Sequence, residues 1–169
     1  MEMEEGGLNK IDAELDQIRQ PNVEIMRLER PRHGQIHPVE GFCSGIVVEC
    51  NGNAEQVDKK VRQILVIVLQ HHGRRPTCEE WRQLLPVWFF EGFGKLIPHA
   101  NEKYGNWQTL EDWLYWFESE NRCWWWWDSS ILSENELIIE IDDQAEPIPW
   151  GDLQLLLLLS GANKTHRER

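Results

Sequence analysis

Four consecutive tryptophans, Trp124 to Trp127, are the feature that most constrains the fold of this chain. Aromatic residues favour strands, and a strand reverses the direction of its side chains at every residue. Two of the indoles would therefore point into the core and two toward the opposite face of the sheet. The second pair has two possible environments: an exposed binding patch of about 300–500 Å², or a second layer of the chain that covers it.

Helical periodicity and capping residues predict most of the helices. Apolar residues recur at helical spacing in 8–19 and in 54–72. Thr77 and Thr109 each precede an acidic residue at the third helical position, which is the pattern of a capping box. A last helix is expected to end at Leu159.

Pro86 follows the helix that Thr77 begins. Proline inside a helix removes a hydrogen bond and clashes with the preceding turn, so we expect a kink or a break there. A second apolar segment, Val87–Phe93, should then end at Gly92 or Gly94.

Four segments have the composition and alternation of strands: Val23–Glu29, Phe42–Cys50, Cys123–Asp128 and Glu136–Asp142. The predicted order is α-β-β-α-α-α-β-β-α. Groups of strands separated by groups of helices indicate an α+β fold. We expect an antiparallel sheet of about four strands with the helices packed mainly on one face.

Length and composition predict a single globular domain, 8–162, between disordered ends at 1–7 and 163–169. The first residues are acidic and lack an apolar stretch, so no secretory signal is expected. The four cysteines form no CxxC pair, which fits free thiols in a reducing cytoplasm. The longest apolar runs are far too short to cross a bilayer.

The charge of −12 is concentrated in one half of the chain. Residues 76–163 carry 16 acidic and 4 basic residues, and they also contain all ten tryptophans. An acidic surface repels nucleic-acid phosphates and anionic membranes, so neither is an expected partner. It favours a basic protein, although a merely solvated acidic surface is the simpler interpretation.

A binding surface is predicted on the sheet face that points away from the core. It combines the four tryptophans, Trp124, Trp125, Trp126 and Trp127, with Asp128, Glu49 and Glu140. Tryptophan is enriched in binding hot spots. We therefore expect a non-enzymatic binding, assembly or inhibitor module whose partner is a basic protein or a second copy of the chain, which would give a homodimer.

A small-ligand-binding protein or an enzyme is the alternative. Its pocket would lie where aromatic residues surround a polar loop, at Trp81, Trp88, His99, Tyr104 and Trp107. The sequence contains no nucleophile elbow, dinucleotide fingerprint or phosphate-binding loop. No catalytic residue and no cofactor is therefore assigned.

The spacing of His33 and His37, followed by Cys43 and Cys50, offers the nitrogen and sulfur ligands that zinc prefers. Neighbouring prolines and Gly34 forbid the helix on which an HxxxH pair would converge. The two cysteines would lie far apart on opposite faces of one strand. We therefore expect no metal site.

The segment Pro149-Trp150-Gly151-Asp152-Leu153, the leucines after it and the Trp-rich strand before it resemble uncharacterised bacterial proteins of the kind common in cyanobacteria. This resemblance covers only the C-terminal part of the chain. It implies no activity, cofactor or site residue.

Overall fold

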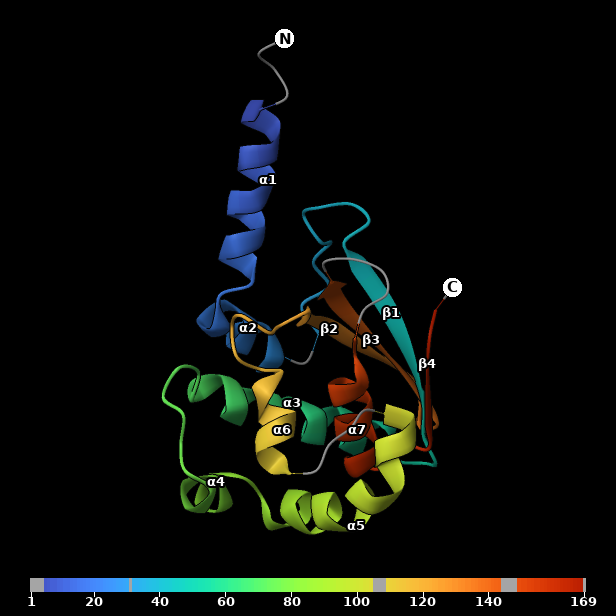
Figure 1. The fold of residues 1–169 in the computed structure, drawn as a ribbon. Coiled ribbons are helices and arrows are strands. Elements are labelled where there is room, and N and C mark those ends of the chain that lie inside the picture. The colour runs from blue at the N-terminus through green and yellow to red at the C-terminus, as the bar shows by residue number, and fades with distance from the viewer. Residues whose placement is uncertain (1–4, 31, 105–108, 144–148, 169) are drawn as a thin grey trace.

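The computed structural model describes residues 5–30, 32–104, 109–143 and 149–168. Over these residues the chain forms seven helices and one four-stranded antiparallel sheet, which confirms the predicted α+β fold (Figure 1). The elements are α1 (Glu5–Ile18), α2 (Pro21–Leu28), β1 (Cys43–Glu49), α3 (Ala54–Gln70), α4 (Cys78–Leu84), α5 (Val87–Tyr104), α6 (Leu110–Tyr115), β2 (Trp124–Ser133), β3 (Glu136–Asp143), α7 (Gly151–Leu159) and β4 (Lys164–Arg167).

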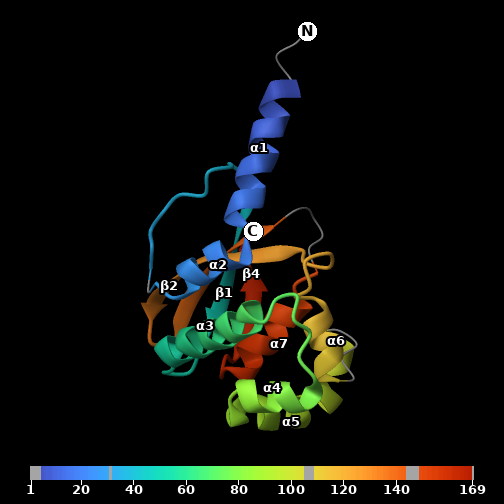
Figure 2. The same ribbon diagram turned by 90° about the vertical axis from the view of Figure 1, so that its left-hand side faces the viewer.

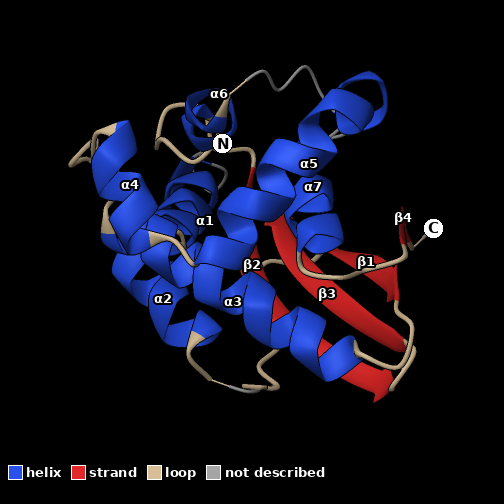
Figure 3. Ribbon diagram, turned by 90° about the horizontal axis from the view of Figure 1, so that it is seen from below, coloured by secondary structure: helices blue, strands red, loops and turns tan. Residues whose placement is uncertain are grey.

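The sheet has the order β2-β3-β1-β4, and its inner face forms the floor of the core. Ile46 and Val48 of β1 pair with Ile139 and Leu137 of β3, and all four side chains are fully buried. Helices α3 and α7 lie over this face, α4, α5 and α6 lie further out on the same side, and α2 packs against β2 at the edge of the sheet (Figures 1 and 3). The core therefore lies between the sheet and a layer of helices, as the alternation of the strands predicted.

The predicted caps and the predicted break are confirmed. Thr77 and Glu80 form a reciprocal capping box at the start of α4, and Thr109 and Asp112 do the same for α6. Helix α4 ends at Leu84, and α5 begins immediately after Pro86. These features are local, because each depends on residues within one helical turn.

Helix α5 is longer than predicted: it passes through Gly92 and Gly94 and ends at Tyr104. Gly92 faces α7, where a Cβ atom would lie 3.0 Å from a methyl group of Leu159, whereas a Cβ at Gly94 would meet nothing within 4 Å. The absent side chain at Gly92 lets the two helices approach closely. Gly92 is thus a packing residue and not a helix end.

The predicted strand Val23–Glu29 is wrong, because this segment forms helix α2. Pro21 occupies the first turn of the helix, where its missing N–H costs no hydrogen bond. Glu24, Arg27 and Leu28 are buried on one side at helical spacing. Two of these three are charged, so the apolar pattern did not indicate a helix.

The predicted disordered ends are also corrected. Lys164–Arg167 forms β4, which pairs antiparallel with β1 at the edge of the sheet. Its residues are polar, and the backbone hydrogen bonds to β1 give the segment a structure that no apolar pattern signals. Helix α1 begins at Glu5, inside the stretch 1–7, and projects from the body of the molecule in both side views (Figures 1 and 2).

Asp152, in the first turn of α7, joins two tryptophans in the core. Its carboxylate accepts a hydrogen bond of 2.9 Å from Nε1 of Trp124, and its carbonyl accepts one of 3.0 Å from Nε1 of Trp113. Burial raises the pKa of the Asp152 carboxyl to about 6, against the opposing effect of the Trp124 hydrogen bond.

Among the described helices, none is long and apolar enough to cross a membrane.

Candidate functional site

All four tryptophans of the run are buried, so the predicted exposed patch is wrong. Their exposed fractions are 1% for Trp124, 7% for Trp125, 0% for Trp126 and 5% for Trp127. Trp124 and Trp126 lie in the core beneath the helices. A bulge between Trp126 and Asp128 leaves Trp127 without an opposing residue on β3, and Trp125 pairs with Asp142.

Cationic and imidazole side chains from the N-terminal segment cover the outer indoles. The guanidinium carbon of Arg19 lies 4.2 Å from the centre of the Trp125 ring. Arg27, His33 and His37 lie 5.0, 5.1 and 4.7 Å from the Trp127 ring. Attraction between cations and aromatic faces makes arginine a suitable cover for an indole. The covering layer was the second possibility that the sequence left open.

The same segment blocks the free edge of β2. Glu24 accepts a hydrogen bond from the backbone N–H of Trp126 at 2.7 Å, and Arg27 donates two, of 2.9 and 3.0 Å, to the carbonyl of Trp126. Arg122 donates to the Trp124 carbonyl and binds both oxygens of Glu24. Unpaired edge strands invite association with other chains. Here side chains occupy the hydrogen-bonding positions of a further strand.

The three acidic residues of the predicted surface differ in exposure, although Asp128 of β2 lies opposite Glu140 of β3 in the sheet. Asp128 is buried, accepts a hydrogen bond from the Gly34 backbone and lies 3.8 Å from Arg62. Glu49 and Glu140 remain partly exposed on the outer sheet face, where Lys164 and His166 approach Glu49. The predicted residues therefore do not form one binding surface.

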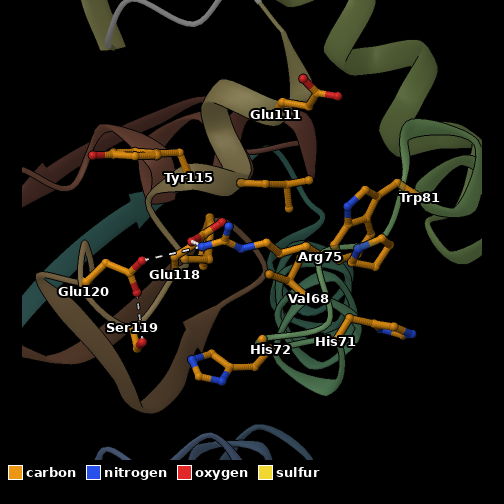
Figure 4. A pocket seen from close by; sticks show the side chains of 14 residues that line it. Val68, His71, His72, Arg75, Trp81, Glu111, Tyr115, Glu118, Ser119 and Glu120 are labelled. Carbon is orange, nitrogen blue, oxygen red and sulfur yellow. Dashed lines mark hydrogen bonds and ion pairs between the residues drawn. The ribbon is translucent and has the colours of Figure 1, made fainter.

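A cavity of about 500 Å³ lies at the corner between the C-terminal end of α3, the start of α4 and helix α6 (Figure 4). Apolar side chains of Val68, Trp81, Leu114 and Phe117 line it. Trp81 packs edge-on against His71, whose Nδ1 lies 2.8 Å from the Ile67 carbonyl at the end of α3. The cavity thus has an aromatic and aliphatic floor at the point where three helices meet.

Ionisable groups surround this floor. Glu111, Glu118 and Glu120 supply three carboxylates, and Arg75 supplies one guanidinium. Arg75 lies 3.1 Å from Glu118 and 3.9 Å from Glu120 (Figure 4). The pKa of Glu120 is lowered, first by its own backbone N–H and then by the hydroxyl of Ser119, with Arg75 contributing. The carboxylates that line the cavity thus outnumber its one guanidinium, and the imidazoles of His71 and His72 lie beside them.

Glu111 also contacts the thiol of Cys78, at 2.8 Å. This hydrogen bond raises the pKa of Cys78, which holds the sulfur in its protonated form. Burial and the carboxylates of Glu140 and Asp142 raise the pKa of Cys43 to about 12. Reactive cysteines are thiolates, so neither residue has the environment of a nucleophile.

A second hollow of about 320 Å³ adjoins the cavity and shares His71 and Pro76 with it. Arg74, Glu80, Gln83 and Leu84 complete its lining. The two hollows share His71 and Pro76 near the α3–α4 connection, so this corner of the molecule can contact an extended ligand.

The alternative pocket predicted from the sequence is found only in part. Trp81 lines the cavity, whereas Trp88 lies on α5 with Lys60 4.8 Å from its ring. His99 and Tyr104 lie on α5, but their side chains, and the whole of Trp107, are outside the described residues. Sequence reasoning missed Arg75 and the three glutamates, because they converge from separate elements.

Within the described ranges, no group of three or more His, Cys, Asp or Glu side chains is arranged to hold a metal ion. His33 and His37 instead contact Trp127, and His37 lies 3.5 Å from Asp142. No protein-family model, curated protein or solved structure matches this chain.

Proposed function

We propose that this chain is a non-enzymatic binding module whose recognition site is the cavity between α3, α4 and α6, and that its partner is a basic segment of another protein. The observation that carries the proposal is the combination of an apolar floor with three carboxylates and one guanidinium around it. Lysine and arginine side chains have long apolar stems and charged ends. Such a side chain can place its stem on Trp81 and its charge among the glutamates.

The location of the site replaces the one expected from the sequence. The buried indoles of β2 leave self-association through an exposed tryptophan pair without support. The acidic character of the 76–163 region still favours a basic partner, because the glutamates of the cavity belong to that region. Four free cysteines fit a reducing compartment, so we place this activity in the cytoplasm.

A small organic cation is the second candidate ligand. A volume of about 500 Å³ falls within the range of small-molecule pockets, about 300–1,000 Å³. The adjoining hollow favours a peptide, because an extended chain can occupy both spaces. Comparison of a peptide with a single-residue analogue therefore separates the two candidates.

Isothermal titration calorimetry with synthetic peptides tests the proposal. A peptide of alternating Leu and Arg should bind, and the same peptide with Glu in place of Arg should not. Replacement of Glu111, Glu118 and Glu120 by Gln should weaken binding of the Arg peptide about tenfold, through loss of three charge interactions. The matched control is a second triple variant, in which Gln replaces the exposed residues Glu29, Glu55 and Glu134. It has the same change in net charge.

Equal affinities of the two triple variants would contradict the proposed site. N-acetylargininamide, titrated in the same way, should bind far more weakly than the Arg peptide. Binding of similar strength would favour the small organic cation.

A further inference from the structure

Arg75 crosses the cavity from the connection between α3 and α4 toward the residues that follow α6 (Figure 4). Its guanidinium contacts Glu118 at 3.1 Å and Glu120 at 3.9 Å, from the opposite side of the hollow. The side chain is 74% exposed, although it reaches over the apolar floor. Arg75 therefore occupies the cavity without being buried in it.

The backbone of Arg75 has a φ of 47°, and it is the one non-glycine residue with positive φ among those that the structure describes. This left-handed conformation is unfavourable for residues with a side chain. The ion pairs of an exposed arginine add little to stability and are screened by salt. Folding stability thus gives no strong reason for an arginine here, and the position suggests a functional role.

We propose that Arg75 occupies the cation subsite of the cavity, and that the group which the partner inserts there is a guanidinium that displaces Arg75. This inference rests on the proposed function and specifies the chemistry of its ligand. Glu118 and Glu120 already arrange their carboxylates around one guanidinium. A planar guanidinium matches carboxylates better than an ammonium does.

The exchange replaces one cation by another of the same kind. When Arg75 leaves, the carboxylates of Glu118 and Glu120 face the incoming guanidinium, so neither is left without a cation. The stem of the incoming side chain gains contact with the apolar floor, whereas Arg75 returns to water. The loss to be overcome is only a set of exposed ion pairs, which is small.

Arg75→Asn is the first test, because asparagine tolerates the left-handed conformation and carries no charge. Arg32→Asn is the matched control: Arg32 is exposed, lines neither hollow and gives the same change in net charge. With the peptide acetyl-Leu-Arg-Leu-amide as probe, Arg75→Asn should raise the affinity about two- to fivefold. Arg32→Asn should leave it unchanged, and the peptide with neutral citrulline in place of Arg should bind weakly to every variant.

Nuclear magnetic resonance of the arginine side chains tests displacement in the unmodified protein. Saturation with the Arg peptide should move the Nε–Hε signal of Arg75 to the position and mobility of a free arginine. An unchanged Arg75 signal at saturation would overturn the inference, as would binding to Arg75→Asn that is equal to or weaker than wild-type binding. In both cases, binding of the Arg peptide to the wild-type protein would still support the proposed function. Absence of binding to all variants would reject the proposed function and the inference together.

Discussion

The carboxylate of Glu24 accepts a hydrogen bond from the backbone N–H of Trp126 at 2.7 Å, although 102 positions separate the two residues in the chain. The same carboxylate binds Arg122 through both oxygens. A helix residue thus closes the edge of the sheet at the centre of the tryptophan run. The contact makes α2 part of the sheet's architecture, in the position where another strand would pair.

Glu24→Gln should lower the free energy of unfolding by about 3 kcal/mol, because it removes the carboxylate that forms the buried ion pair with Arg122. Urea denaturation followed by tryptophan fluorescence measures the change. Glu29→Gln, at an exposed position just after α2, should stay within about 0.5 kcal/mol of the wild type. Similar stabilities of the two variants would show that Glu24 does not hold the edge.

Arg19→Met should also destabilise the fold by about 3 kcal/mol. The buried carboxylate of Asp142 would lose the guanidinium that donates hydrogen bonds to both of its oxygens. Burial raises the pKa of Asp142, but hydrogen bonds from Arg19 and His37 outweigh it and lower the pKa overall. The stability that this pair contributes is therefore present at neutral pH and is lost as pH falls below about 4.

The difference in stability between Arg19→Met and the wild type should accordingly shrink in that acidic range. Denaturation curves between pH 7 and pH 3 measure it. Arg32→Met, at an exposed residue of the same segment, is the control. A difference that does not depend on pH would contradict the assigned role of Asp142.

The free energy of unfolding of Asp152→Asn should increase relative to that of the wild type as pH rises from about 4 to 6. In the folded protein Asp152 keeps its proton up to a pKa of about 6, whereas in the unfolded chain it loses the proton near 3.8. The folded state binds more protons in this window, so the wild type loses stability as pH rises, by up to about 3 kcal/mol. Asparagine does not titrate and should lack this loss.

The measurement is the free energy of unfolding of both proteins at intervals across that window. For Asp16→Asn, at an exposed position in α1, the free energy of unfolding should change with pH in parallel with that of the wild type. Parallel curves for Asp152→Asn and the wild type would mean that Asp152 does not bind a proton on folding.

Gly94→Ala should stabilise the protein by about 1 kcal/mol, because alanine is the better helix former and nothing lies within 4 Å of the new Cβ. Gly92→Ala should gain less or lose stability, because its Cβ would press on Leu159 of α7 at 3.0 Å. Thermal unfolding of the two variants measures the difference. A larger gain at Gly92 would refute the close packing of α5 on α7.

The candidate site was only partly predictable. Trp81 could be chosen from the sequence because it belongs to an aromatic region with a clear helix cap at Thr77. Arg75 and Glu118 lie 43 positions apart and meet only when α3 and α6 pack around one corner. Charged residues in turns carry no periodic pattern, so no local rule selects them as a pair.

The sequence by itself determined the class of the fold, the helix caps and the break at Pro86, because apolar periodicity, capping and proline geometry act within a few residues. It also required a strand of tryptophans to point two indoles away from the core. Only the tertiary structure decided what those indoles meet. Arg27 lies 99 positions from Trp126, and its contacts depend on where α2 packs rather than on any pattern in the run itself.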